Sequence, residues 1–308
     1  MKPIVSVIIP TYRRDESLCR TLEMLFVQDR QDFEVIVVDQ SPRHNEKTRL
    51  YLEQVRHKIN YIASEHPNLP AARNTGIRAS SGHIVVFFDD DIQAPPSTLT
   101  QLLNSYNDSM VDGVCGYIIF KTRLNNEVCS VSFERHFRNR HNSVRLVSVR
   151  DFIGGFMSFR REVFEQVGYF DEWIGSQPGG LGEDFEFSHR LQLVGRRLFL
   201  NPAISVFHES ELDGGCGKTN MALDEKQFLS MKMCFYAYLK NRRNDGISGF
   251  ASAIYRCYRA YILNRSILSL DPRFHYQRHR RFFHALQYAL SASRERNVRK
   301  PMHPRFSA

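Results

Sequence analysis

The stretch Ile84-Val85-Val86-Phe87-Phe88-Asp89-Asp90-Asp91 decides the fold of this 308-residue chain. Five consecutive apolar residues are typical of a strand that is buried on both faces, as strands are in a parallel sheet. Three adjacent carboxylates follow this strand directly. Because ligands in open α/β sheets bind beyond the carboxyl ends of the strands, the stretch predicts a ligand site at this edge.

Strand and helix patterns alternate on both sides of this stretch. Apolar runs typical of strands occupy residues 4–9, 33–38, 59–63 and 203–207. Helical patterns lie near residues 15–26, 45–57, 70–80, 96–106 and 185–194. This order predicts an α/β fold with a mostly parallel, doubly wound, Rossmann-like sheet.

Charge divides the chain into two parts. The net charge is +9, and from Lys240 to the end there are 15 Lys and Arg against 3 Asp and Glu, so the positive excess lies in the tail. Helical patterns near residues 221–241, 248–268 and 277–293 coincide with it. We therefore expect an α/β domain at residues 1–220 and a helical, basic C-terminal extension at residues 221–308, whose charge favours an anionic partner.

Other features of the chain favour a cytoplasmic location. No apolar run approaches the ~20 residues that a membrane-spanning helix needs, and the N-terminus lacks the pattern of a signal peptide. The six cysteines have no two-residue spacing of the kind found in zinc or redox motifs. Reduced thiols in the cytoplasm are the simplest interpretation.

The three aspartates after the buried strand repel one another and need compensation. A divalent cation with oxygen ligands, Mg²⁺ or Mn²⁺, would supply it. Alternation along an extended chain directs Asp89 and Asp91 to one side and Asp90 to the other. The alternative is a helix cap and a solvated turn, although a cap needs only one aspartate.

Four more polar residues are candidates for a functional site, each with a structural alternative, and Asp39 is expected at the same sheet edge as Asp89. Asp39 ends the second strand and can accept hydrogen bonds from a nucleobase or ribose, or form an Asx turn. Arg73 can bind a phosphate or form a surface salt bridge. Asp184 follows a glycine-rich turn and begins a helix, where it is a general base or a cap. His208 follows the last strand, where a lone histidine is more often structural than a ligand.

Taken in order, seven segments resemble glycosyltransferase family 2, whose members have the GT-A fold. The matching segments are residues 5–12, 37–41, 72–76, 88–91, 154–161, 167–172 and 182–184. The resemblance implies roles for individual residues. The donor would be bound by Pro10, Thr11, Tyr12, Asp39, Arg73, Asp89, Asp90 and Gly155. The metal would be held by the DXD pair Asp89 and Asp91 with His208, and Asp184 would be the catalytic base.

The resemblance implies an inverting, metal-dependent enzyme that moves a sugar from a nucleotide-diphosphate donor to a hydroxyl of a glycan or lipid-linked acceptor, in polysaccharide or glycolipid biosynthesis. Processive synthases of the family carry a Gln-x-x-Arg-Trp motif after the base, whereas the only tryptophan here, Trp173, precedes it. Non-processive transfer is therefore favoured. Gln40 stands where the family often has a second aspartate, which leaves recognition of the base open.

Two alternatives remain. A nucleotidyltransferase would usually carry a glycine-rich loop after the first strand, and residues 10–14 contain no glycine. A non-catalytic nucleotide-sugar or nucleic-acid binding protein would not need Glu183-Asp184 beside three aspartates, and we find no nucleic-acid motif.

The tail has apolar helical faces with arginine borders, which suit an anionic membrane surface on the cytoplasmic side. These faces comprise Phe250, Ile254, Tyr258, Tyr261, Ile262, Phe282, Phe283, Leu286 and Leu290. The alternative is that they pack on the catalytic domain.

Overall fold

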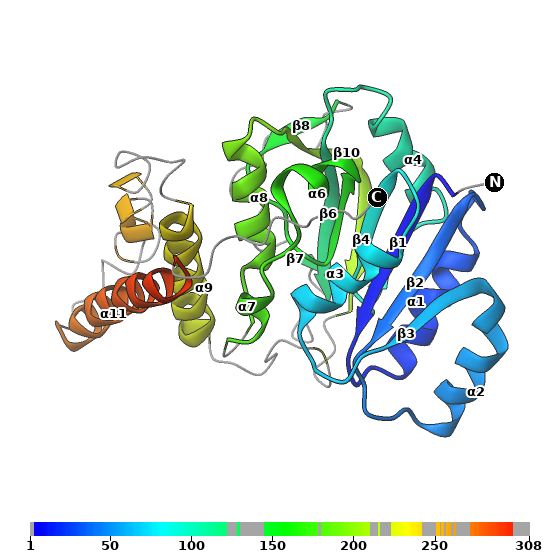
Figure 1. Cartoon of the computed structure of the whole chain (residues 1–308), viewed down its shortest axis with the longest axis horizontal. Coiled ribbons are helices and arrows are strands. Elements are labelled where there is room, and N and C mark those ends of the chain that lie inside the picture. The colour runs from blue at the N-terminus through cyan, green and yellow to red at the C-terminus, as the bar shows by residue number, and fades with distance from the viewer. Residues whose placement is uncertain are drawn as a thin grey trace.

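The computed structural model describes residues 3–121, 128–129, 145–177, 180–209, 215, 223–241, parts of 251–262 and 272–297. The described chain is built around one sheet, whose strand order is β3-β2-β1-β4-β9-β6-β10-β5 (Figure 1). The direction of strand addition reverses at β1, which has β2 on one side and β4 on the other. The four neighbouring strands β3, β2, β1 and β4 form the parallel half of the sheet.

The parallel half follows the predicted alternation. Strand β1 (Val5–Thr11) pairs in parallel with β2 (Phe33–Asp39) and β4 (Ile84–Phe88), and β2 pairs in parallel with β3 (Ile59–Ala63). The connecting segments form α1 (Glu16–Phe26), α2 (Glu46–Val55), η1 (Arg56–Lys58) and α3 (Leu69–Ala79), and α4 (Thr98–Ser105) follows β4. The register places Thr11 opposite Asp39, so the two strand ends meet at one edge.

The other half of the sheet is mixed, and two of its central strands were not predicted. Strand β9 (Phe156–Arg160) lies antiparallel between β4 and β6 (Gly113–Lys121). Strand β10 (Leu198–His208) is parallel to β6 and extends beyond the predicted strand at 203–207. Short antiparallel strands complete the sheet, namely β5 (Ile92–Gln93), β7 (Val128–Cys129) and β8 (Val147–Val149).

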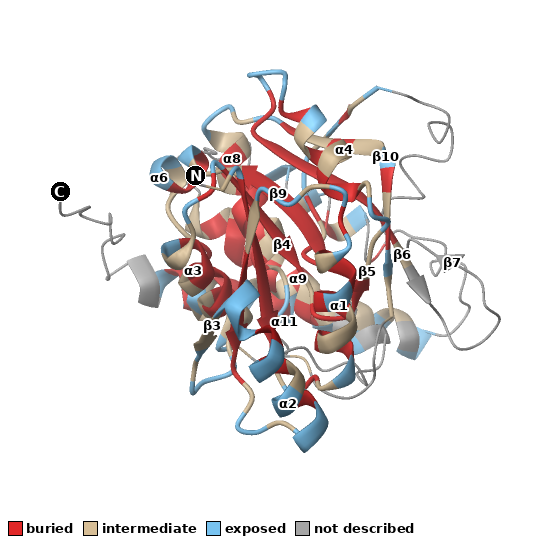
Figure 2. Ribbon diagram, turned by 90° about the vertical axis from the view of Figure 1, so that its right-hand side faces the viewer, coloured by how far each residue is buried: buried red, intermediate tan, exposed pale blue. Residues whose placement is uncertain are grey.

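Helices cover both faces of the sheet with separate apolar cores. One core joins the sheet to α1 and α4 through residues such as Leu22 and Leu102. The opposite core joins it to α3, α6 (Glu162–Val167) and α8 (Glu183–Leu193), with Phe159, Phe164 and Phe187 in mutual contact. Figure 2 shows the central strands as the most buried part of the molecule. This buried sheet is the rigid support on which the strand-end residues are held.

The C-terminal helices α9 (Leu223–Lys240) and α11 (Pro272–Asn297) pack against each other at one end of the molecule, next to α7 (Glu172–Gly175) and α8 (Figure 1). They form a third apolar core with Ile174. Tyr236 donates a hydrogen bond to Asp171, 2.8 Å away, and Lys240 reaches both Asp171 and Glu186 at 2.8 Å. The extension is therefore docked on the α/β part by buried polar contacts.

This packing corrects the predicted lipid-facing surfaces. The third core includes Ile254, Tyr258, Ile262, Phe282, Leu286 and Leu290. Of the predicted apolar faces, Phe283 is exposed, whereas Phe250 and Tyr261 lie outside the described residues. Within the described parts of the chain, every helix is too short or too polar to cross a membrane.

Candidate active site

Three ligand atoms converge where β4 and β10 end. One ligand atom from each of Asp89, Asp91 and His208 lies within 4.8 Å of the other two. The antiparallel pairing of β10 with β5 places His208 opposite Ile92, immediately after Asp91. Two backbone bonds hold this corner, from the Asp89 amide to the Gly155 carbonyl (3.0 Å) and from the Glu209 amide to the Asp91 carbonyl (3.0 Å).

The middle aspartate points elsewhere, as strand alternation predicts. Thr11 Oγ1 donates a hydrogen bond to Asp90 Oδ2 across 2.6 Å, and both side chains are buried. Burial, with help from the charge of Asp91, raises the pKa of Asp90 to about 7. The hydrogen bond between Asp90 and Thr11 therefore joins the ends of β4 and β1, and the Asp90 side chain points away from the three-ligand group.

Two basic side chains, Arg14 and His208, lie beside the carboxylates of Asp89 and Asp91. Arg14 Nη1 lies 3.2 Å from Asp91 Oδ2, and both groups are almost fully buried. His208 Nε2 lies 3.5 Å from Asp91 Oδ1 and 3.7 Å from Asp89 Oδ2. Burial lowers the pKa of His208, but the two carboxylates outweigh it and raise that pKa. Arg14 was not among the predicted site residues, because an arginine in a loop carries no pattern of its own.

The donor set fits a divalent cation. Two carboxylates and one imidazole are ligands that Mn²⁺ and Mg²⁺ sites use, with the imidazole favouring the transition metal. The side chains of Asp89 and His208 are 27% and 18% exposed, so the group is open on one side to an incoming ligand. Gly155 keeps that space clear, since a Cβ there would lie 3.2 Å from His208 Cδ2 and 3.5 Å from Asp89 Oδ2.

Arg73 connects this corner to the start of α8 and is only 1% exposed, so the surface salt bridge alternative is wrong. Its Nη1 donates to Glu183 Oε1 at 2.6 Å, and its Nη2 donates to the Gly154 carbonyl at 3.0 Å and lies 3.5 Å from Asp89 Oδ1. Its guanidinium also lies within 6 Å of the ring centroids of two phenylalanines, Phe87 and Phe170. The buried Arg73 side chain thus bonds to other groups of the protein, namely Glu183, Asp89 and the Gly154 carbonyl.

Asp184 lies in the first turn of α8, after Gly182 at the N-cap position. Its Oδ2 accepts the Gly154 amide at 2.8 Å and its Oδ1 accepts the Phe185 amide at 2.7 Å. Burial raises the pKa of Asp184, although Arg73 and the two amides oppose the shift. Burial, with the charge of Asp184, also raises the pKa of Glu183 to about 7. A half-buried carboxylate with a raised pKa is suited to accept a proton near neutral pH.

Asp39 lies at the end of β2 inside a hydrogen-bond cluster. Its Oδ2 accepts hydrogen bonds from His44 and from the Tyr61 hydroxyl (2.5 Å), and its Oδ1 accepts the Ser41 amide (2.8 Å), which is an Asx-type turn. Burial raises the pKa of Asp39, but these donors outweigh it and hold that pKa low. Sequence reasoning missed His44 and Tyr61.

The remaining predicted donor residues line the same edge. Pro10 is buried within β1, and Tyr12 follows the strand half-buried, with the Arg13 guanidinium 5.1 Å from its ring centroid. Arg13 has a φ of 53°, a conformation that costs a non-glycine residue energy. Gln40 is buried and binds the backbone of His66 (2.5 Å) and Asn68 (3.2 Å), so it fixes a loop rather than facing a ligand.

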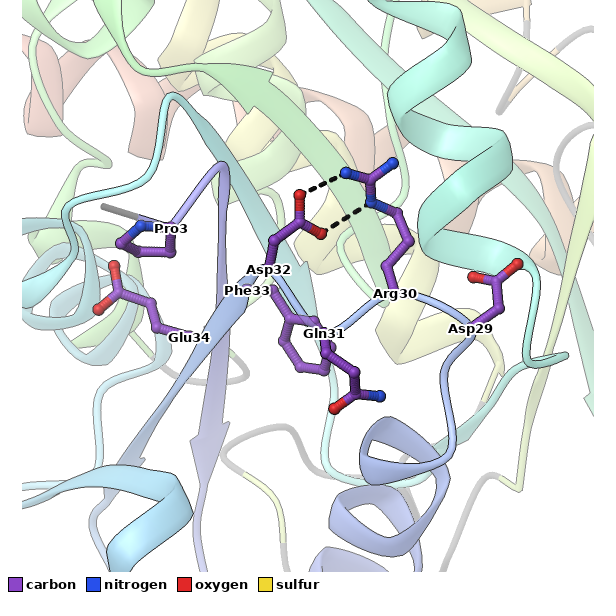
Figure 3. Close-up of a pocket in the computed structure, with 7 residues that line it drawn as sticks. All are labelled: Pro3, Asp29, Arg30, Gln31, Asp32, Phe33 and Glu34. Carbon is purple, nitrogen blue, oxygen red and sulfur yellow. Dashed lines mark hydrogen bonds and ion pairs between the residues drawn. The ribbon is translucent and has the colours of Figure 1, made fainter. Parts of the chain in front are cut away.

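A separate pocket lies at the opposite end of β1 and β2, away from this edge (Figure 3). It is lined by Pro3 and residues 29–34, and the Arg30–Asp32 ion pair crosses it. None of the predicted site residues is in its lining.

Comparison with known proteins finds relatives among glycosyltransferases. The GalNAc(5)-diNAcBac-PP-undecaprenol β-1,3-glucosyltransferase of Campylobacter jejuni is 26% identical over 187 residues, which cover 57% of each chain. The matched region covers between 13% and 57% of the length of four curated relatives.

Two solved structures share the fold. The mannosyltransferase PcManGT from Pyrobaculum calidifontis, in complex with GDP-Man and Mn²⁺, superposes with a TM-score of 0.58 at 19% identity, covering 98% of this chain and 88% of that one. S. aureus TarS 1-349, in complex with UDP-GlcNAc, gives 0.62 at 19% identity, covering 96% and 82%. Residues 6–168 match the profile of glycosyl transferase family 2. With its GT-A architecture and this match over more than half its length, the chain belongs to glycosyl transferase family 2.

Proposed function

We propose that this chain is an inverting, metal-dependent, non-processive glycosyltransferase that moves one sugar from a nucleotide-diphosphate donor to an acceptor hydroxyl. The observation that carries the proposal is the convergence of Asp89, Asp91 and His208 within 4.8 Å, linked through Arg73 and Gly154 to Asp184. Donor-binding and base groups thus share one hydrogen-bonded framework.

Asp184 would remove the proton from the acceptor hydroxyl, whose oxygen then attacks the anomeric carbon on the face opposite the diphosphate. Inversion of the anomeric configuration follows from this single displacement. The amides of Gly154 and Phe185 fix the orientation of the carboxylate, which leaves its remaining lone pairs for the acceptor. Asp89, Asp91 and His208 would hold the cation, which would neutralise the negative charge that develops on the leaving diphosphate.

The donor would lie along the strand ends from Asp39 to Asp89. Half-buried Tyr12 would line this stretch, with Pro10 and Thr11 buried in the strand end that supports it, and Asp39 would contact the nucleobase. The neighbouring structures contain UDP and GDP sugars, which supports a nucleotide sugar as the ligand of this edge.

A panel of UDP, GDP, ADP, CDP and dTDP sugars tests the proposal. The full-length protein should hydrolyse at least one donor slowly when Mn²⁺ or Mg²⁺ is present, and anomeric NMR of a transfer product should show inversion. Absence of turnover and of nucleotide binding across the whole panel contradicts the proposal. With excess donor, a defined acceptor should gain a single sugar, whereas a ladder of products contradicts non-processive transfer.

We also propose a lipid-linked or glycan acceptor and a location on the cytoplasmic face of a membrane. The name of the Campylobacter relative supports the acceptor class. The exposed residues of α11 support the location, because the aromatic residues Tyr276 and Phe283 are 68% and 60% exposed on a helix that also carries exposed Arg280 and Arg294.

Sedimentation with anionic and neutral vesicles tests this location. The protein should bind anionic vesicles at low salt, and the double change Arg280→Glu and Arg294→Glu should abolish binding. Arg78→Glu, on exposed α3 surface, is the matched control. Equal sedimentation with both vesicle types, or none, contradicts the membrane proposal and leaves the transfer reaction unaffected.

A further inference from the structure

The imidazole of His44 lies between two carboxylates. Its Nδ1 is 2.8 Å from Asp15 Oδ1, and its Nε2 is hydrogen-bonded to Asp39 Oδ2. The side chain of His44 is 9% exposed and that of Asp39 is 1% exposed, whereas that of Asp15 is 35% exposed. The histidine therefore joins a surface carboxylate to a buried one at the donor edge of the sheet.

This geometry fixes the protonation state of His44. A neutral imidazole donates from one nitrogen only, whereas ionised carboxylates are acceptors only. Two carboxylate partners on opposite ring nitrogens are therefore both satisfied only by the imidazolium form. The hydrogen bond to Asp39 raises the pKa of His44, burial opposes the shift, and Asp15 raises it further.

Asp15 acts here as a partner of His44 and not as the helix cap that its position before α1 favours. It occupies the N-cap position, but its side chain makes no capping hydrogen bond. Instead Asp15 Oδ1 accepts the Nδ1–H of His44 and the amide of Asn45 (3.2 Å). These two hydrogen bonds attach the segment before α2 to the start of α1. They also fix the side of the His44 ring that faces away from Asp39.

Tyr61, Arg56 and Asp39 are titratable groups that also belong to this cluster or act on it. Tyr61, from β3, donates to Asp39, and burial together with Asp39 raises the pKa of its hydroxyl, so it stays protonated. Arg56, after α2, acts weakly on Tyr61 in the opposite direction. Asp39 keeps a low pKa and stays ionised. His44 is then the one group of these whose charge changes near neutral pH.

We propose that His44 is a positioning residue for donor binding, whose imidazolium holds the Asp39 carboxylate in the orientation that meets the nucleobase. The inference rests on the proposed function, since it assumes that the nucleotide lies against Asp39. Loss of the proton removes one of the two carboxylate contacts and the positive charge beside Asp39, which leaves the hydroxyl of Tyr61 and the amide of Ser41 as its remaining fixed donors. Nucleotide affinity should therefore fall as the pH rises through the pKa of His44, while the chemical step at Asp184 is untouched.

Calorimetric titration of the full-length protein with UDP and GDP in the presence of Mg²⁺, from mildly acidic to mildly alkaline pH, tests the proposal. The wild-type dissociation constant should rise with pH. His44→Gln keeps one donor and no charge, so affinity at acidic pH should fall roughly tenfold or more and become independent of pH in this range. At saturating donor, kcat should remain near that of the wild type. His57→Gln, an exposed histidine of η1, is the matched control and should behave as the wild type.

Asp15→Asn gives a second, independent measurement that leaves Asp39 and the donor surface intact. It removes one charge that stabilises the imidazolium, so the pH at which affinity falls should move to lower values, in step with the His44 pKa measured by ¹⁵N NMR. Wild-type affinity and pH profile in His44→Gln overturn the inference. If His44→Gln does not fold, an unchanged profile in Asp15→Asn with a shifted His44 pKa overturns it equally. If neither UDP nor GDP binds, the titration is repeated with ADP, CDP and dTDP, and failure of the wild type to bind all five contradicts the proposed function itself, and the inference with it.

Discussion

Arg73 donates a hydrogen bond to Glu183 across 2.6 Å, although 110 positions separate the two residues in the chain. The same guanidinium reaches the Gly154 carbonyl and Asp89. It therefore fixes the distance between the strand end of the expected metal group and the helix that carries Asp184. This connection distinguishes a positioning role for Arg73 from the donor contact that the family resemblance implies.

Arg73→Lys keeps the charge but loses the planar fork that reaches three acceptors. We expect kcat to fall by roughly tenfold or more with a smaller change in donor KM, together with a lower Tm. Arg78→Gln, an exposed arginine on the same helix, is the control. Steady-state kinetics and thermal melting on the same samples check the prediction. A variant that mainly raises donor KM, with normal Tm and kcat, would restore the donor-binding role.

Asp91→Asn and Asp90→Asn should separate the two sides of the strand end. Asp91→Asn removes a carboxylate of the three-ligand group, so Mn²⁺ binding and transfer should be lost. Asp90 already has a pKa of about 7, and Asn resembles its protonated form, so this variant should keep most activity. Manganese calorimetry and activity after EDTA treatment, with and without added Mn²⁺, provide the measurements. Full transfer in chelated, metal-free protein would sink the assignment.

Asp184→Asn removes the proposed base and keeps one oxygen, which can accept only one of the two backbone amides that the carboxylate accepts. The value of kcat should fall by ~10²-fold or more with donor affinity nearly unchanged, and Tm should fall modestly because one amide loses its acceptor. Glu165→Gln, an exposed carboxylate on α6, is the control. If the residue serves only to cap α8, a lower Tm with normal specific activity is expected instead.

Acid should weaken the attachment of α9. Burial alone would raise the pKa of Glu186, but Arg190 and Lys240 outweigh it and lower that pKa to about 2. A carboxylate whose pKa is lower in the folded state stabilises the fold above its unfolded pKa. That contribution, about 3 kcal/mol by linkage, should disappear as the pH falls from about 5 towards 2.

Lys240→Met should therefore lower the free energy of unfolding by about 1–3 kcal/mol at neutral pH and flatten its dependence on acidic pH. Lys47→Met, on the exposed surface of α2, is the control for loss of a charge. Urea unfolding at several pH values measures both slopes. An acid profile of Lys240→Met that matches the wild type would argue against the Glu186 linkage.

The parallel half of the fold was predictable because its signals are local. The strand at Ile84–Phe88 is an uninterrupted apolar run, and each connecting helix shows its own periodicity. Strands β6 and β9 were missed, since their identity depends on partners. Phe156 pairs with Phe88, and Val114 pairs with Ser158, across gaps that no local window spans. Ser158 also interrupts the apolar pattern of β9, and its hydroxyl is satisfied inside the sheet by hydrogen bonds with the Val114 carbonyl (2.7 Å) and the Tyr106 hydroxyl (2.8 Å).

The same distinction holds for the site. Three consecutive aspartates are visible in the sequence, and alternation already separates Asp90 from its neighbours. Arg14 and His44 are single polar residues in loops, and their importance comes from partners that the sheet brings to them, namely Asp91 after β4 and Asp39 at the end of β2. Arg73 was identified, but its burial depends on Glu183 and Gly154, which sequence spacing does not reveal.

Met233 of α9 lies directly against Gly182, where a Cβ would come within 2.9 Å of the methionine Cβ. The glycine has a φ of 102° and immediately precedes Glu183 and Asp184. Helix α9 of the C-terminal extension therefore packs directly against the turn that precedes the proposed base. For protein engineering, this makes residue 220 a poor crossover point. A chimera that exchanges the extension between relatives should carry α7 and α8 with α9, so that Asp171, Gly182 and Glu186 keep the helix with which they evolved.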